Sequence, residues 1–441
     1  MLKRLLFALS LAAQARAQTG PPPYLALGDS LGEGVQSADS TYRTQPFGYP
    51  NRIAGQLRVS FPLPLIKGGA FTIVGSVRGR TRVDPTVEGS NLAVAGADST
   101  SILNDRAGTP IDRETDLVLL PRIGSQVEIA ESLQSPLMTC WIGSNDALGT
   151  VLSFDHLDAS QLTPVPVFAS NYQQIVQRLT AWNNKVVFAN VPDVTEVGFL
   201  VDNQVLTRFL GRDFGLPSGS YTTLVAMLLF KLGINDGSLL QDPDWVLDPS
   251  EVQTIHGTIQ RYNEIIAREA ARVHMPVVDI NGFLRYVHEH PPVIGSVVLT
   301  TNYLGGIYSL DGVHPSNTGH AVVANEFIKK MNSAFQMNVA LISGQELLTI
   351  FERDPFVDFD GDLKVRGRPL AGILETLGPS LGISGDFTNA SAPGTDVPRG
   401  PEFMRAYFTA AGRDANTPWS ESDAIEALRH IFGLQKWTPN R

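Results

Sequence analysis

The feature that most constrains the fold of this chain is the alternation of short apolar runs with longer amphipathic stretches. Five runs have the composition of buried strands: Tyr24–Leu27, Thr72–Val77, Leu137–Ile142, Lys185–Val191 and Pro276–Ile280. Strands that are apolar on both faces are typical of parallel sheets covered by helices on each side. The order strand, helix, strand predicts a doubly wound α/β sheet, and we expect a central five-stranded parallel sheet.

The stretches between these runs have helical patterns. The clearest helix is predicted over Pro249–His274, where Asp248 can act as the N-cap and Glu251 completes a capping box. Pro249 suits the first helical position because it has no N–H to leave unpaired. Further helices are expected over Asn171–Trp182, Asn317–Phe335 and Ser420–Leu434.

The first residues have the pattern of a Sec-type signal peptide. Lys3 and Arg4 precede an apolar run over Leu5–Ala13, and small residues follow up to Ala17. The apolar run has about nine residues, whereas a spanning helix needs roughly 20, so we expect cleavage near Ala17 and no stable membrane anchor. The mature protein is expected to be exported, either to the periplasm or to the medium.

The net charge limits the possible binding partners, and the single cysteine has a simple structural interpretation. The formal net charge is −10, and removal of the leader lowers it to −13 because three basic groups are lost. An acidic chain repels nucleic acid and anionic lipid, so we expect no nucleic-acid partner. The single cysteine, Cys140, lies in the apolar run Leu137–Ile142, and we interpret it as a small buried hydrophobic residue.

Ser30 stands directly after the first candidate strand, within Gly28-Asp29-Ser30-Leu31-Gly32. The pattern G-x-S-x-G also marks the nucleophile elbow of α/β-hydrolases. In that fold the elbow comes after several strands, whereas Ser30 follows the first one. We therefore interpret Ser30 as a candidate nucleophile of another family, with Gly32 completing the pattern by coincidence.

A serine hydroxyl becomes a useful nucleophile only when a base takes its proton and an acid orients that base. Among the eight histidines, only His314 has an acid, Asp311, three residues before it. On a tight turn this spacing lets Asp311 reach back to the imidazole. Pro315 and Ser316 suit the start of a following helix, so one loop supplies candidates for both acid and base.

Acyl transfer also develops negative charge on an oxygen, and donors must already point at it. Gly96, in the segment Asn91–Ala97, offers a backbone N–H, and Asn145, in Gly143–Asp146, offers a side-chain amide. In an open parallel sheet the ligand crevice lies outside the carboxyl ends of the strands. Ser30 and Asn145 are both expected at that edge.

These four blocks, taken in order, resemble the SGNH or GDSL hydrolase family. The blocks are Gly28–Leu31 (GDSL), Asn91–Ala97 with its glycine, Gly143–Asp146 (G-x-N-D) and Asp311–Pro315 (D-x-x-H-P). The resemblance covers residues 22–335. The segments 144–149 and 191–195 are similar to those of the bacterial lipase and phospholipase-like branch.

The resemblance implies a flavodoxin-like three-layer α/β/α fold and ester hydrolysis without metal or nucleotide cofactors. It implies that Ser30 is the nucleophile, His314 the general base and then acid, and Asp311 the group that orients His314. The backbone N–H groups of Ser30 and Gly96, with the amide of Asn145, would form the oxyanion hole.

We expect a signal peptide at 1–17, a hydrolase domain at 18–335 and a C-terminal appendage of unknown role at 336–441. Residues 197–248 form an insert that does not fit the simple alternation. Its apolar run Tyr221–Phe230 is either a lid or acyl-binding wall or, in the plainer interpretation, a core helix.

No metal site is expected. Asp358–Asp362 resembles the start of a calcium loop, but Pro369 stands where the bidentate glutamate belongs. His288 and His290 lack a third ligand at a suitable spacing.

The expected function is that of an exported serine esterase or lipase that hydrolyses carboxylic esters, small-molecule or lipid, through an acyl-enzyme intermediate. The apolar run Tyr221–Phe230 favours acyl or lipid esters. Two alternatives stay open: a carbohydrate O-acetylesterase of the same fold, and a non-catalytic exported binding module. The sequence does not indicate the oligomeric state.

Overall fold

The structure of the protein is a computed structural model that describes residues 20–68, 79–153, 155–295, 297–357, 400–410 and 412–431. Three predicted features lie outside these residues: the signal peptide, the candidate strand Thr72–Val77 and the calcium-like stretch Asp358–Asp362.

The centre of the fold is a parallel sheet. Its strands are β1 (Leu25–Gly28), β4 (Leu137–Trp141), β5 (Lys185–Ala189) and β8 (Val277–Val278), in the order β1-β4-β5-β8. The register pairs Leu25 with Met138, Leu137 with Lys185, and Phe188 with Val277. Parallel pairing confirms the predicted α/β class.

The predicted count of five strands is wrong for the described residues, in which the parallel sheet has four. Residues 90–94 run beside β1, and the Leu92 N–H donates to the Ala26 carbonyl at 2.8 Å, but only one bridge forms, between Ala26 and Asn91. The Ala93 N–H, which points away from β1, donates to the Asn91 side chain at 3.2 Å. The Val94 N–H, which faces β1, donates to the Gly28 carbonyl at 3.1 Å, so this segment runs beside β1 without forming a regular strand ladder.

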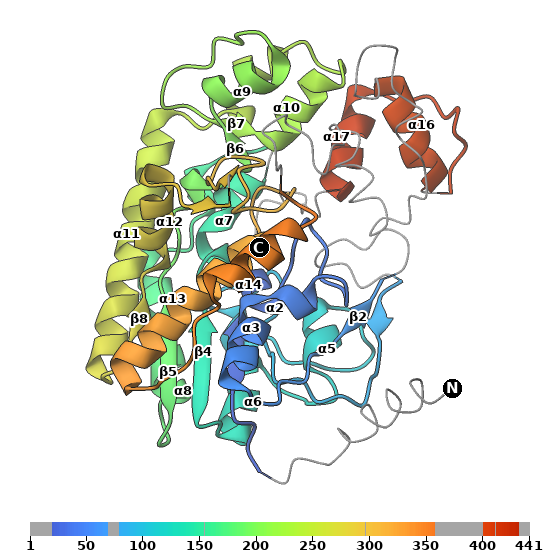
Figure 1. The fold of residues 1–441 in the computed structure, drawn as a ribbon. Coiled ribbons are helices and arrows are strands. Elements are labelled where there is room, and N and C mark those ends of the chain that lie inside the picture. The colour runs from blue at the N-terminus through green and yellow to red at the C-terminus, as the bar shows by residue number, and fades with distance from the viewer. Residues whose placement is uncertain are drawn as a thin grey trace.

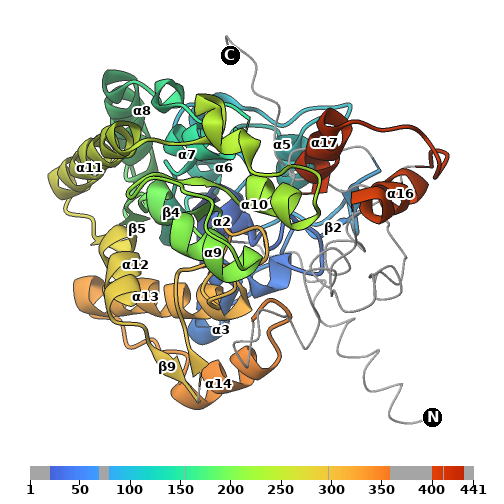
Figure 2. The ribbon, with the colours of Figure 1, turned by 90° about the horizontal axis from the view of Figure 1, so that it is seen from above.

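Helices cover both faces of the sheet and give three layers, as Figure 2 shows. One face carries α3 (Tyr49–Leu57) and α13 (Asn317–Phe335), and the other carries α6 (Gln126–Leu133), α8 (Val165–Leu179) and α11 (Pro249–Arg272). Alternate residues of β1 divide between the two cores: Leu25 and Leu27 face the α8 side, whereas Tyr24 and Ala26 face the α13 side. This division requires strands that are apolar on both faces.

The helix predictions hold with small shifts at the ends. In α11, the Asp248 side chain accepts from the Glu251 N–H at 2.9 Å, and Glu251 accepts from the Asp248 N–H at 3.0 Å, which is the predicted capping box. The helix ends at Arg272, two residues before the predicted end, and His274 takes a left-handed φ of 57°. Helix α13 spans the predicted residues, α8 begins and ends earlier than predicted, and α17 spans Glu421–Ile431.

Shorter elements join these layers. The helices are α2 (Ser30–Glu33), α4 (Ser101–Asn104), α5 (Glu114–Leu119), α7 (Asn145–Leu152) and α12 (Ile280–Glu289). Two small hairpins pair β2 (Ile66–Lys67) with β3 (Thr81–Arg82) and β9 (Val293–Ile294) with β10 (Val297–Val298). The 3-10 helices are η1 (Gln45–Phe47), η2 (Ala159–Gln161), η3 (Val194–Glu196), η4 (Ser238–Gln241) and η5 (Pro243–Trp245).

Residues 197–248 form a small unit that joins the main core. It contains β6 (Leu200–Val201), α9 (Asn203–Leu210), β7 (Thr222–Thr223) and α10 (Leu224–Lys231). The apolar run Tyr221–Phe230 thus lies mainly in α10, whose residues Leu224–Phe230 are all buried in the larger hydrophobic cluster. The lid role suggested for this insert stays a prediction.

After α13 the chain forms α14 (Gly344–Glu352), which packs on α13, and later α16 (Gly400–Ala410) and α17, which packs on α10. Figure 1 shows α16 and α17 beside α10, at the end of the molecule where the insert lies. Within the described residues, no helix is both long and apolar enough to span a bilayer.

Candidate active site

The structure places Ser30 at the junction between β1 and α2. Asp29 caps this helix, because its carboxylate accepts from the Leu31 N–H at 2.9 Å. Gly32 packs closely against the glycine block, since a Cβ at this position would lie 2.6 Å from the Cβ of Ala93. Gly32 therefore has a packing reason of its own, unrelated to a nucleophile elbow.

The structure brings Ser30, His314 and Asp311 together, although the first two are 284 residues apart. Nε2 of His314 lies 2.8 Å from Oγ of Ser30, and Nδ1 lies 2.7 Å from Oδ2 of Asp311. Ser30 is 5% exposed and Asp311 is 3% exposed. The three side chains form one continuous chain of hydrogen bonds that ends in a buried carboxylate.

The Asp311 carboxylate is fully engaged by its surroundings. Oδ1 accepts from the N–H groups of Val313 and His314, both at 2.9 Å, and Oδ2 also accepts from the N–H of Ala38 at 2.8 Å. Burial alone would raise the pKa of Asp311, but the imidazole of His314 and these N–H groups outweigh burial and hold the pKa below its ordinary value. Asp311 therefore stays ionised beside His314.

Gly312 is required within this loop. Its φ is +72°, and a Cβ would come within 2.6 Å of the backbone nitrogen of Phe199. The Phe199 N–H donates to the Gly312 carbonyl at 2.9 Å, so the start of the insert packs directly on the loop between Asp311 and His314.

The predicted oxyanion donors come from three segments: the start of α2, the glycine block and the start of α7. As the first residue of α2, Ser30 has an N–H with no acceptor inside the helix. Gly96 has open space beside it, because a Cβ there would meet nothing within 4 Å. Nδ2 of Asn145 donates to the Ala97 carbonyl at 2.7 Å, which fixes the amide and leaves its second N–H available.

Two buried acids tie the glycine block in place. Asp146 accepts from the N–H of Ser99 at 2.8 Å and from its hydroxyl at 2.6 Å. Glu33, one turn after Ser30, accepts from the N–H of Ala95 at 2.7 Å. Burial raises the pKa of Asp146 to about 6, and burial followed by the nearby carboxylate of Glu114 raises the pKa of Glu33 well above its ordinary value.

Asp29, the residue before Ser30, is completely buried. Burial raises its pKa to about 7, although the Leu31 N–H and the nearby imidazole of His314 act in the opposite direction. The hydroxyl of Ser144 lies beside this carboxyl, and a hydrogen bond from it also favours the ionised form. Burial outweighs these partners, which is why the pKa stays raised.

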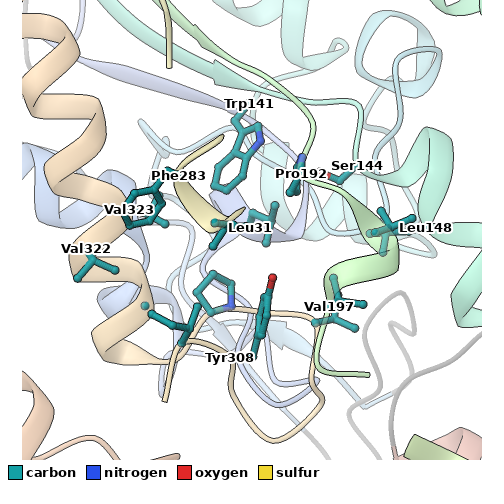
Figure 3. Close-up of a pocket in the computed structure, with 16 residues that line it drawn as sticks. Leu31, Trp141, Ser144, Leu148, Pro192, Val197, Phe283, Tyr308, Val322 and Val323 are labelled. Carbon is teal, nitrogen blue, oxygen red and sulfur yellow. The ribbon is translucent and has the colours of Figure 1, made fainter. Parts of the chain in front are cut away.

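A narrow apolar pocket is formed in part by the sequence neighbours of Ser30 and His314. Its volume is about 30 Å³, and its walls include Leu31, Trp141, Phe283, Tyr308 and Val313 but not Ser30 or His314. Figure 3 shows Leu31, Trp141, Phe283 and Tyr308 surrounding this space. A volume of about 10 to 15 Å³ holds one water, so the pocket as it stands accepts a group of only a few heavy atoms.

The apolar run Tyr221–Phe230 does not line this pocket. Its buried side chains belong to the larger core cluster. The sequence-based reason for favouring long acyl chains therefore finds no support in the walls of the pocket.

Sequence reasoning missed the contacts that hold the Asp311 loop to the start of the chain. Ser37 accepts from the Leu310 N–H at 3.0 Å, and the Ser37 N–H donates to Ser309 at 2.8 Å. Ser37 and Ala38 both adopt left-handed φ angles, of 50° and 58°. No local pattern marks these residues, because their partners lie more than 270 positions away.

A serine in contact with a histidine that a buried carboxylate orients, at the carboxyl edge of a parallel sheet, defines a serine hydrolase. The family model described as GDSL-like Lipase/Acylhydrolase matches residues 24–327. The chain belongs to this family and is an enzyme that acts on carboxylic ester bonds. No curated protein matches the chain.

Several solved structures are similar to this chain. A phospholipase A1 from Streptomyces albidoflavus is 16% identical, with 71% of this chain and 100% of that chain covered and a TM-score of 0.36. An extracellular lipase from Streptomyces rimosus is 15% identical, with coverage of 70% and 98% and a TM-score of 0.34. An acetylxylan esterase variant from Geobacillus stearothermophilus is 12% identical, with coverage of 71% and 96% and a TM-score of 0.35.

Proposed function

We propose that the protein is an exported serine esterase or lipase that hydrolyses acyl esters through an acyl-enzyme intermediate. The observation that carries this proposal is the chain of hydrogen bonds from Ser30 through His314 to Asp311, next to an apolar pocket. Ser30 is the nucleophile, His314 the general base and acid, and Asp311 the group that orients the imidazole.

In the first step, Oγ of Ser30 forms a bond to the ester carbonyl carbon while its proton passes to Nε2 of His314, 2.8 Å away. The ionised Asp311 accepts from Nδ1, which keeps that nitrogen protonated and leaves Nε2 free to take the proton. Asp311 also stabilises the imidazolium that forms, because its pKa lies below its ordinary value.

The carbonyl oxygen becomes an oxyanion in this step. The N–H groups of Ser30 and Gly96 and the second N–H of Asn145 stabilise it, and because Asn145 is already held by Ala97, little reorganisation is needed. His314 then gives its proton to the departing alcohol, which breaks the ester bond and leaves the acyl group on Ser30. Water repeats the cycle, with His314 as base, and releases the carboxylic acid.

The apolar pocket is proposed to receive the acyl group. Its walls include Leu31, which follows Ser30, and Val313, which precedes His314, although the side chains of Ser30 and His314 are not part of its walls. Its volume of about 30 Å³ suits a short acyl chain, and longer chains would need a larger pocket.

The small volume of the pocket also favours a second candidate function, the removal of acetyl groups from carbohydrates. An acetyl group has one methyl to bury, and the pocket accepts it without rearrangement. The two functions differ in the alcohol that leaves, and a comparison of substrates separates them.

The nucleophile is tested by labelling the protein with a fluorophosphonate and mapping the modified peptide. We expect the label on Ser30, loss of labelling in Ser30→Ala, and unchanged labelling in Ser218→Ala, which alters an exposed loop serine. A label on another residue, or undiminished labelling of Ser30→Ala, would refute the proposed nucleophile.

The acyl preference is tested with p-nitrophenyl esters of increasing chain length and with acetylated xylan. Phe283→Ala is expected to move the preferred chain length upward, because it enlarges the pocket. Tyr286→Ala is the matched control, since this residue lies on the same helix and is 60% exposed. Activity that is strong on acetylated xylan and weak on every simple ester would favour the second function.

Export is proposed from the leader at residues 1–17. The amino terminus of the protein recovered from the periplasm or the medium is expected to begin at Gln18. Recovery of the uncleaved chain from the cytoplasm would refute this.

A further inference from the structure

The chain that leaves α13 turns back and lies along it. Asn332 and Val339 exchange two hydrogen bonds, of 2.8 and 2.9 Å, between the side-chain amide and the backbone. Asn325 and Ile342 exchange a second pair, of 3.0 and 2.8 Å. The two asparagines are seven residues apart and therefore on one face of the helix. The returning segment is thus fastened to α13 at two points.

After α14, the chain reaches the beginning of α13. Asp354 is completely buried, and its Oδ2 accepts from the N–H of Thr318 at 2.7 Å and from its hydroxyl at 2.8 Å. Its Oδ1 accepts from the Phe356 N–H at 3.1 Å. A carboxylate at this place satisfies an otherwise unpaired N–H and complements the helix dipole. Thr318 lies only four residues after His314.

The same segment also supports the other side of the histidine loop. Val357 is buried against Gly306, where a Cβ would come within 3.4 Å of its side chain. The Gly306 carbonyl accepts from the hydroxyl of Ser316 at 2.6 Å, and Ser316 caps α13. Both sides of the loop around His314 therefore rest on residues that follow α14.

We propose that residues 337–357, here called the C-terminal brace, hold the His314 loop in its reactive position, with Asp354 as a positioning residue. This proposal rests on the proposed function, in which His314 is the base. The family match ends at residue 327, so the brace lies beyond the matched part of the chain. Without the carboxylate of Asp354, the first turn of α13 loses an acceptor and the loop before it becomes less well fixed.

The charges that face Asp354 come from two other helices. Arg52 on α3 is its cationic neighbour, and His320 on α13 also lies near Arg52. Burial lowers the pKa of His320 to about 3, so this imidazole is neutral. The structural role of Asp354 is therefore set by its hydrogen bonds to Thr318 and Phe356 and does not depend on protonation of His320.

The test compares Asp354→Ala and Asp354→Asn with Asp248→Ala, which removes the cap of the distant helix α11. All are assayed with p-nitrophenyl acetate at a temperature at which each is folded by circular dichroism. We expect kcat of Asp354→Ala to fall by about tenfold to a hundredfold with KM little changed, because a displaced base affects the chemical step. The kcat of Asp354→Asn is expected to lie between those of Asp354→Ala and the wild type, since its amide oxygen can still accept from Thr318.

Asp248→Ala is expected to lower the unfolding temperature without changing kcat. If Asp354→Ala does not fold, the pair Thr318→Ala and Thr318→Ser takes its place: kcat falls in the first and recovers in the second, which keeps the hydroxyl. Wild-type kcat in folded Asp354→Ala, or equal kcat in the two Thr318 variants, would overturn the proposal.

Amide hydrogen exchange separates this proposal from the proposed function. Faster exchange in the peptide 306–319 of Asp354→Ala, with unchanged exchange around Ser30, is expected whether or not the ester is a substrate. Unchanged exchange in 306–319 refutes the brace. A wild-type protein that neither cleaves esters nor reacts with a fluorophosphonate refutes the proposed function instead.

Discussion

The turn that carries Ser30 and the loop that carries His314 are held in place in different ways. Ser30 follows β1 of the parallel sheet, and its turn is closed by local contacts such as the Asp29 cap and the bond from the Gly34 N–H to the Ser30 carbonyl, 3.1 Å long. Between β10 and α13, by contrast, residues 299–316 contain only isolated bridges. That loop is positioned by contacts with residues distant in sequence.

This difference indicates which part of the site is less sensitive to substitutions at distant positions. The nucleophile is fixed by the sheet and by neighbours within a few residues. The base depends on Ser37, Ala38, Phe199 and Asp354, which come from three separate parts of the chain. Substitutions at these remote positions are therefore expected to act on the loop and to leave the nucleophile in place.

The largest effect is expected from Ser30→Ala. Removal of the nucleophile is expected to lower kcat by roughly a millionfold, as loss of a triad serine does in other enzymes. Ester hydrolysis measured with a p-nitrophenyl ester checks this. The variant should still fold, because within the described part of the chain the Ser30 hydroxyl bonds only to His314. Turnover at the wild-type rate would show that another site is active.

Asp311→Asn tests the loop half of the site while preserving the shape of the side chain. We expect a fall of about ten-thousandfold in kcat, because an amide facing Nδ1 stabilises the wrong tautomer of His314. The amide would also lose an acceptor for the Ala38 N–H. A fall of less than tenfold, measured on folded protein, would contradict the role given to Asp311.

Asp29→Asn probes the nucleophile half through the pH dependence of stability. The folded-state pKa of Asp29, about 7, lies above its ordinary value of 3.8, so its stabilising contribution is fully present below about pH 4 and is lost as the pH rises through 7. The amide keeps the acceptor for Leu31 and cannot ionise. From pH 4 to pH 8 the wild type is expected to lose on the order of 4 kcal/mol of unfolding free energy that the variant keeps.

Denaturant titrations of both proteins across this pH range measure that gain. Parallel curves, with a constant difference between variant and wild type, would mean that Asp29 has an ordinary pKa.

Asn145→Ala removes the proposed oxyanion donor at the start of α7, the helix that follows β4. We expect kcat to fall by a hundredfold to a thousandfold with little change in KM. Asn145→Asp is the matched variant, because it keeps the shape of the side chain and loses the N–H donor. Its kcat should fall at least as far as that of Asn145→Ala. Near-wild-type kcat in both variants would remove Asn145 from the oxyanion hole.

The smallest effect is expected from Ser37→Ala. This variant tests most directly whether the His314 loop, unlike the Ser30 turn, depends on distant contacts. It leaves the buried N–H of Leu310 without its acceptor, a loss of about 1 to 3 kcal/mol, and loosens the loop. We expect kcat to fall about tenfold while fluorophosphonate still labels Ser30. Ser333→Ala, an exposed serine on α13, serves as the control. Equal kcat in both variants would show that the loop does not need this contact.

The elements that could be predicted are those that are determined by residues close to them in sequence. The capping box of α11 and both ends of α13 follow from residues within one turn of the helix ends, and they appear as expected. The number of strands did not follow, because the candidate strand Thr72–Val77 lies outside the described residues and residues 90–94, which run beside β1, form only one bridge. No sequence pattern indicated the contacts of Ser37, because the residues that it contacts are hundreds of positions away.

The sequence by itself determined which chemical groups this enzyme has and where each would stand relative to a strand or helix end, because periodicity, caps and turn residues act over a few positions. Only the tertiary structure decided that Ser30 and His314 meet at 2.8 Å, that the adjoining pocket is narrow, and that Asp354 supports the histidine loop. The physical reason is that these distances depend on how layers of the whole core pack, which no single segment encodes.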